Sequence, residues 1–167
     1  MNHITDAEQA ARTAMEVDYE LYAEGEALLG WLNATVQLKQ ATLFDANAVL
    51  RRLAGAIQNR LNREGAEVAH LKMTFNPDAG LGDIAMINLV RNDYVPEVSL
   101  TLEEPVQSGQ LIVNLRAEAP PELLRDAAQS ALAGLATPFP DLDATLEHVE
   151  HFRPGRPQPT HRMTTWA

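Results

Sequence analysis

The sequence predicts an α+β fold, a ferredoxin-like (split β-α-β) two-layer sandwich in which two main helices cover one face of an antiparallel sheet. Segments of alternating apolar and polar residues recur along the chain, and segments with helical spacing interrupt them. The expected order is strand, helix, strand, strand, hairpin, helix, strand. Beyond the split β-α-β pattern, we expect one additional strand and a short N-terminal helix.

The first part of the chain predicts a helix followed by a strand. Residues 5–15 are rich in alanine, and Thr5 with Glu8 three positions later fits a capping box, which is typical of a helix start. In residues 31–39 every second residue is apolar, whereas the residues between them are mostly polar. This period of two predicts a strand with one buried face.

The strongest helix signals follow this strand. Asp45 can cap a helix N-terminus, and Gly65 supplies a stop about five turns later. Between them, apolar residues recur at helical spacing and predict one buried stripe. These residues are Ala46, Val49, Leu50, Leu53, Ile57 and Leu61.

The middle of the chain predicts further strands. Residues 69–75 alternate and end in a turn-forming cluster, and residues 84–91 form the next expected strand. Residues 98–102 and 111–115 are both β-prone, and a proline and a Ser-Gly pair stand between them. We therefore expect these two segments to pair as a hairpin.

A second main helix and a last strand complete the expected fold. Pro120-Pro121 suits a helix start, and apolar residues at helical spacing continue to Leu135. Residues 143–152 predict the final strand. The prolines that follow lack the amide donor that a strand ladder needs. We therefore divide the chain into a helix and lead-in (1–27), one α+β domain (28–152) and a tail rich in proline and arginine (153–167).

Composition excludes several classes of function. The formal net charge of −10 opposes nonspecific binding to nucleic acid or to anionic membrane. The chain has no cysteine, which excludes thiolate metal sites and cysteine nucleophiles and suits the cytoplasm. It also has no secretory signal, no membrane-spanning run and no phosphate-loop motif. We therefore expect a cytoplasmic protein that binds neither nucleic acid nor membrane.

The polar side chains of the expected strands form the first candidate site. If the helices cover one face of the sheet, these side chains share the other face. That face is either ordinary solvated sheet or a docking surface for a partner domain or an anionic ligand, with Lys72 and Arg116 as cationic contacts. The residues are Asn33, Thr35, Gln37, His70, Lys72, Asn114 and Arg116.

Histidines near the C-terminus form a second candidate site. His148 and His151 stand among glutamates, and His161 follows, so zinc or another divalent metal is an alternative to the expectation of no cofactor. Residues three apart on a strand point to opposite faces, which opposes a shared ion unless the strand is bulged. His70 could act as a general base, but no nucleophile motif accompanies it.

Four segments of the chain together resemble the C-terminal domain of CobW-like GTPases, a class associated with metal-chaperone and cobalamin-related functions. The segments are Leu29–Ala34 (LGWLNA), Gly65–Met73 (GAEVAHLKM), Ile112–Glu118 (IVNLRAE) and His151–Arg162 (HFRPGRPQPTHR). They span most of the chain from about residue 28 onward, in the order expected for a single domain. The nucleotide-binding loop and the cysteine metal motif of such GTPases are both missing from this sequence.

The resemblance implies a noncatalytic accessory domain that acts with a protein partner, such as a separate GTPase, in metal or cofactor handling. The polar positions in the matched segments would then serve binding: His70, Lys72, Asn114, Arg116, Arg153, Arg156, His161 and Arg162. Two alternatives stay open. One is a small metal-dependent or acid-base enzyme that uses the histidines. The other is a homodimer formed through the exposed sheet face.

Overall fold

The computed structural model describes residues 29–91 and 94–154. In chain order the elements are β1 (Gly30–Phe44), α2 (Ala46–Arg63), β2 (Glu67–Pro77), β3 (Ala85–Leu89), β4 (Glu97–Leu100), β5 (Val106–Glu118), α3 (Pro121–Ala133), a 3-10 turn (Gly134–Ala136) and β6 (Asp143–Phe152). The predicted N-terminal helix and most of the predicted tail lie outside the described residues.

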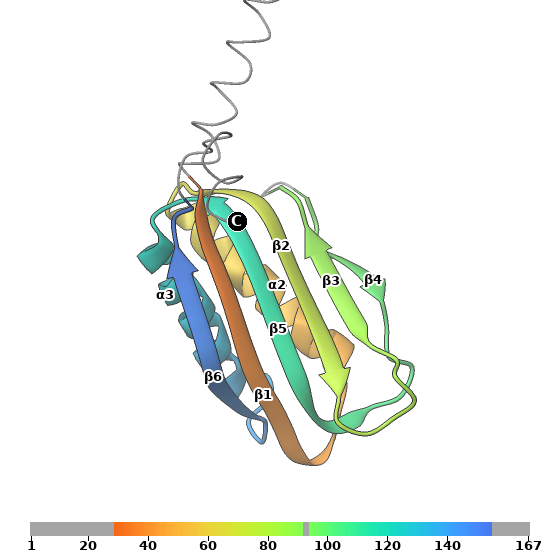
Figure 1. The fold of residues 1–167 in the computed structure, drawn as a ribbon. Helices are drawn as coiled ribbons and strands as arrows, with labels where there is room; N and C mark the ends of the chain where they lie inside the picture. Colours follow the sequence, from red (N-terminus) through yellow and green to blue (C-terminus); the bar gives the residue numbers. More distant parts are fainter. Residues whose placement is uncertain (1–28, 92–93, 155–167) are drawn as a thin grey trace, which may run out of the picture.

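The strands form one six-stranded sheet in the order β4-β3-β2-β5-β1-β6 (Figure 1). Every neighbouring pair is antiparallel. Strand β5 lies between β1 and β2, which α2 connects, and β1 lies between β5 and β6, which α3 connects. The predicted α+β class, with two helices on an antiparallel sheet, is therefore confirmed.

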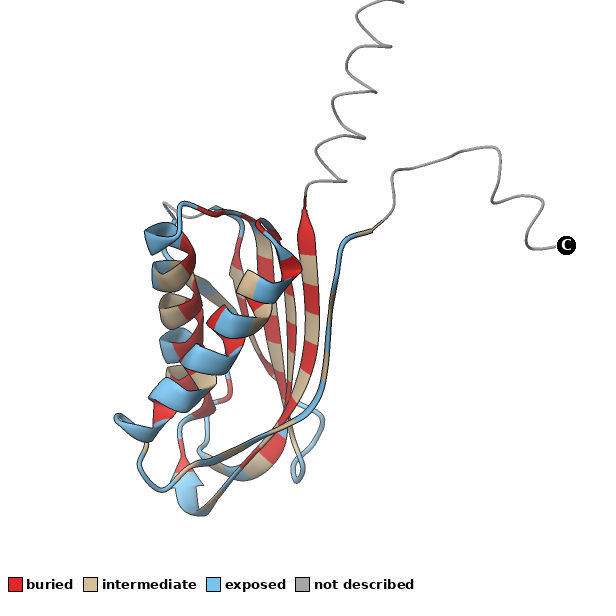
Figure 2. Cartoon of the chain, turned by 90° about the vertical axis from the view of Figure 1, so that its left-hand side faces the viewer, coloured by how far each residue is buried: buried red, intermediate tan, exposed pale blue. Residues whose placement is uncertain are grey.

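Both helices cover the same face of the sheet (Figure 2). Their buried residues face the sheet, and alternate residues of the central strands complete the core between the two layers. Leu32, Leu71 and Leu115, from β1, β2 and β5, are fully or almost fully buried there. The other face of the sheet is covered by no helix of the described residues.

The helix α2 begins and ends where the sequence predicts. The Asp45 carboxylate accepts hydrogen bonds from the backbone N–H groups of Asn47 (2.9 Å) and Ala48 (3.3 Å). These groups have no partner within the helix, so the carboxylate satisfies them. After the last turn, Gly65 has φ +70°, which a residue without a Cβ adopts at little cost.

The predicted hairpin of residues 98–102 with 111–115 is wrong. Strand β4 pairs with β3, placing Leu100 opposite Met86, whereas β5 pairs with β1 and β2. Strand β5 is long, and its residues from Leu111 to Ala117 that face the helices are buried, so it belongs in the middle of the sheet. The four-residue β4 is mostly exposed, as suits an edge strand. Together β3 and β4 extend the sheet by two strands rather than one.

A pair of hydrogen bonds fastens the connection between β4 and β5 to α2. The Asn47 side-chain amide donates to the backbone oxygen of Leu102 (2.7 Å), and its oxygen accepts from the Leu102 N–H (2.9 Å). Both bonds are partly buried. One side chain therefore satisfies both backbone groups of a loop residue.

Replacing Asn47 with alanine should lower the free energy of unfolding by about 2 kcal/mol, because the Leu102 backbone groups lose their partners. Asn59→Ala is a matched control on the exposed side of the same helix and should change stability by less than about 0.5 kcal/mol. Urea denaturation measures both values. Equal stability of the two variants would show that water replaces the Asn47 bonds without cost.

Candidate functional site

The sheet face opposite the helices, which we call the open face, carries the side chains that the sequence predicted to share one surface. On β1, β2 and β5 they alternate with the buried core residues, which point toward the helices. The positions are Asn33, Thr35, Gln37, His70, Lys72, Asn114 and Arg116, of which only Arg116 is fully in the exposed class. Three strands thus bring polar groups from distant parts of the chain onto one surface.

A bulge in β2 adjusts which residues face outward. The pairing with β5 shifts between Val68 and His70, so that Ala69 has no partner on β5. Val68 is buried and Ala69 is exposed, although period-two alternation predicts that Ala69 faces the core. The bulge restores the alternation for the rest of the strand. His70 therefore lies directly opposite Arg116.

The strand register aligns open-face residues into rows across the sheet. His70 pairs with Arg116, Arg116 with Trp31, and Trp31 with Phe152. We call these four residues the aromatic row. It lies at the end of the sheet where β1 begins and β6 ends (Figure 1).

Three side chains of the aromatic row contact one another, Arg116 with Trp31 and Trp31 with Phe152. The guanidinium carbon of Arg116 lies 3.9 Å from the centroid of the Trp31 ring, well within cation–π distance. The rings of Trp31 and Phe152 have centroids 5.7 Å apart and are tilted by 43°. Phe152 is 38% exposed. The stack therefore holds Arg116 in one orientation at an accessible surface.

The next row of the open face is polar. Lys72 lies opposite Asn114, Asn114 opposite Asn33, and Asn33 opposite Glu150. Glu150 lies beside His148, with its Oε1 3.2 Å from the imidazole Nε2, and both side chains are more than half exposed. Within the residues that the structure describes, neither Lys72 nor Arg116 forms an ion pair.

The indole N–H of Trp31 is buried and has no hydrogen-bond acceptor among the described residues. A buried donor without a partner costs about 1 to 3 kcal/mol. Neither Trp31 nor Phe152 is among the candidate site residues that the sequence predicts. The period of two already placed Trp31 on the open face, but its contact with Arg116 depends on the order of the strands.

The predicted metal-site histidines of β6 do not face each other. A bulge between Leu146 and His148 shifts the register, after which His148 lies opposite Thr35 and His151 opposite Leu32. Thr35 belongs to the open face and Leu32 to the core face, so the two imidazoles point to opposite sides of the sheet. In ranges 29–91 and 94–154, no three histidine or acidic side chains form a metal-binding group.

Of the binding residues predicted in the tail, the structure describes only Arg153. Arg153 follows β6 and is exposed. Arg156, His161 and Arg162 lie outside the described residues, so their predicted binding role stays a prediction.

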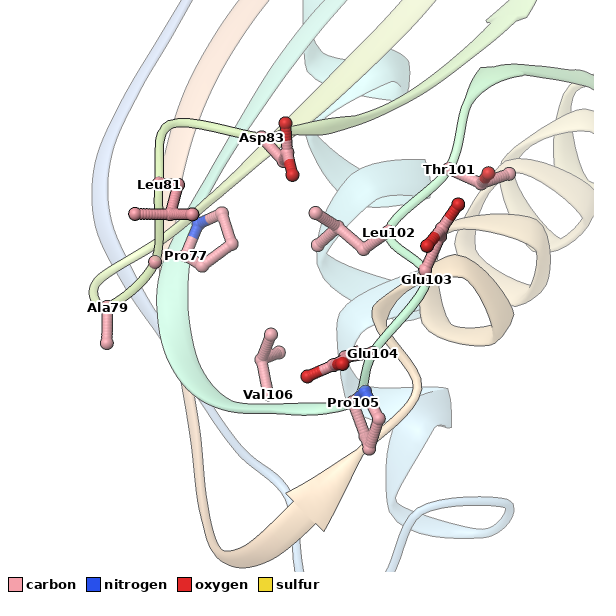
Figure 3. A pocket seen from close by; sticks show the side chains of 11 residues that line it. Pro77, Ala79, Leu81, Asp83, Thr101, Leu102, Glu103, Glu104, Pro105 and Val106 are labelled. Carbon is pink, nitrogen blue, oxygen red and sulfur yellow. The ribbon is translucent and has the colours of Figure 1, made fainter.

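A separate hollow of about 560 Å³ lies at the far end of the sheet, between the β2–β3 and β4–β5 connections (Figure 3). Leu102 and Val106 form part of its apolar wall, and Asp83, Glu103 and Glu104 surround it. It contains no basic residue, and none of the predicted site residues reaches it.

No helix in the described part of the chain has the length and apolar character needed to cross a membrane. Comparison with known proteins leaves the family of this chain open, because no family model, no curated protein and no solved structure gives a significant match to it.

Proposed function

We propose that this chain is a noncatalytic accessory domain that binds a protein partner through the open face of its sheet. By its resemblance to the C-terminal domain of CobW-like GTPases, the proposed partner is a separate GTPase of that class, acting in cytoplasmic metal or cofactor handling. The role requires no resident cofactor.

The aromatic row is the observation that carries this proposal. Energetic hot spots of protein interfaces are enriched in tryptophan, tyrosine and arginine. Here Arg116 is stacked on Trp31 and Trp31 contacts Phe152, on a sheet face that no helix of the described residues covers. Because these side chains already hold one another, little conformational entropy would be lost on binding.

The polar surroundings of the row also favour a protein partner. Asn33 and Asn114 lie next to the row and offer both donors and acceptors. A surface with aromatic and arginine contacts beside amide groups is typical of transient interfaces, which combine an apolar centre with polar hydrogen-bonding groups.

Calorimetric titration of the intact chain with a CobW-like GTPase from the same genome, with and without GTP, tests this function. We expect binding with a negative heat-capacity change. Arg116→Ala and Phe152→Ala should each weaken the affinity by about tenfold, the typical loss for a hot-spot residue. Arg52→Ala, on the exposed side of α2 in the other layer, should leave it unchanged.

Unfolding curves should show that Arg116→Ala and Phe152→Ala keep the fold, so that a loss of binding reports on the surface. Absence of binding to any such GTPase, or equal affinities of all three variants, would contradict the proposal. Light scattering of the intact chain distinguishes the alternative in which the open face forms a homodimer.

A further inference from the structure

We infer that the open face recognises a carboxylate-rich segment of its partner, with Arg116 and Lys72 as the principal contacts and His70 beside them. This inference rests on the proposed function, because it assumes that the open face is the binding surface, and it adds the chemistry of the segment that binds there.

The distribution of charge is the first argument. The chain has 23 acidic and 13 basic residues, so its net charge repels anions at long range. Yet Lys39 and Lys72, which are its two lysines, both lie on strands with their side chains on the open face, and Arg116 lies there too. Within the described residues Lys72 and Arg116 have no ion-pair partner. Their charges are therefore available to an external carboxylate.

Within the described residues, the carboxylates of the open face form no ion pair with Lys72 or Arg116, although Asp143 lies opposite Lys39. Glu150, on the row of Lys72, lies with its Oε1 3.2 Å from the Nε2 of His148. Glu67 and Glu118 lie opposite each other beyond the aromatic row, at the end of β5. An acidic segment laid along the rows of Lys72 and Arg116 would meet cations and amides at its centre and acidic groups only at its ends.

The geometry of Arg116 selects a planar anion. One side of its guanidinium group packs on Trp31, which leaves the N–H donors in the guanidinium plane for other partners. Two of these donors match the two oxygens of a carboxylate. Because the stack fixes the orientation, less side-chain entropy is lost than for a free arginine.

The same arrangement favours a short protein segment over nucleic acid or a membrane surface. An extended polyanion would cover the acidic surroundings as well as the cationic rows, and the net charge of −10 opposes that approach. A short segment contacts the rows alone. Asn33 and Asn114, beside Lys72, can bond the backbone groups of such a segment.

Trp31 provides the readout for the test. The chain contains two tryptophans, so Trp166→Phe in the full-length protein leaves Trp31 as the single indole. The probe is a short synthetic peptide of alternating glutamate and alanine, and its counterpart has lysine in place of glutamate. We expect the glutamate peptide to change Trp31 fluorescence in a saturable manner and the lysine peptide to have no effect.

Arg116→Gln and Lys72→Gln should each weaken binding of the glutamate peptide about fivefold, as expected for a partly exposed ion pair. Raising NaCl from about 50 to 500 mM should weaken it further, because exposed charges are screened. Arg52→Gln removes the same charge from the helix layer and should leave the affinity unchanged.

Absence of peptide binding, or equal binding of both peptides, would overturn the inference. The proposed function survives if the GTPase binds with an affinity that salt and Lys72→Gln do not alter, whereas the inference then fails. If only the peptide binds, the inference stands and the GTPase assignment fails.

The acidic residues between Asp6 and Glu26 of the same chain are a competing occupant. Their replacement by the matching amides in the full-length protein should leave the affinity for the glutamate peptide within about twofold if the occupant is a separate partner. An increase of about tenfold or more would show that the chain's own N-terminal segment occupies the open face, which would overturn the inference.

Discussion

Replacing Gly109 with alanine should lower the free energy of unfolding by about 3 kcal/mol, which is among the largest effects we expect from a single added methyl group. Gly109 is buried in β5, opposite Pro77 of β2 and Leu38 of β1. A Cβ at this position would overlap the ring of Phe75 and lie 2.5 Å from the backbone oxygen of Asn76.

The overlap is costly because neither neighbour can move easily. Phe75 is fully buried and packs edge-on against Phe44, with ring centroids 6.1 Å apart. The Asn76 oxygen belongs to the backbone of β2. Relief of the overlap therefore requires a shift of the pairing between β2 and β5 or a displaced aromatic ring.

Gly55→Ala is the matched control for Gly109→Ala. Gly55 lies inside α2, and a Cβ there would meet no atom within 4 Å. Alanine should stabilise the protein by about 0.5 to 1 kcal/mol, because it favours the helix and restricts the unfolded chain. Urea denaturation of both variants should give shifts of opposite sign, and a Gly109→Ala variant as stable as the parent would contradict the close contact with Phe75.

Leu71→Ala should cost about 3 kcal/mol of folding stability, whereas Leu81→Ala should change it by less than about 0.5 kcal/mol. Both variants remove the same side-chain atoms, at two positions that are ten residues apart in the chain. Leu71 is fully buried between the sheet and the helices, and Leu81, in the connection after β2, is completely exposed. Truncation of Leu71 removes apolar contacts and leaves a cavity, whereas Leu81 already faces solvent in the folded state.

Thermal and urea unfolding of the two leucine variants should agree in order. Leu71→Ala should lower the midpoint in both experiments with little change in the denaturant slope. A cost at Leu81 similar to that at Leu71 would mean that the connection after β2 is covered by another part of the chain.

Local sequence signals were sufficient for most elements of this protein. Asp45 and Gly65 mark the ends of α2 because capping and positive φ depend on neighbouring residues, and β6 spans the predicted residues 143–152. The period of two also assigned Asn33, Lys72 and Arg116 to one face, since alternation is a property of each strand by itself.

The pairing of the strands was harder to predict from the sequence. The turn between residues 102 and 111 resembles a hairpin connection, yet β4 and β5 have different partners. Turn residues specify where the chain reverses, whereas the partner of a strand depends on how much apolar surface the whole sheet buries. The binding role of His70 and Arg153 remains a prediction. The position of a side chain on a sheet face does not identify the molecule that binds there.

The sequence by itself determined the α+β class, the two main helices and the side chains that lie on the open face, because each follows from the spacing of neighbouring residues. Only the tertiary structure decided that Arg116 stacks on Trp31 next to Phe152, and that His148 and His151 lie on opposite faces. These contacts join residues far apart in the chain or depend on a bulge. Strand order and register, which arise from packing of the complete core, bring such residues together or keep them apart.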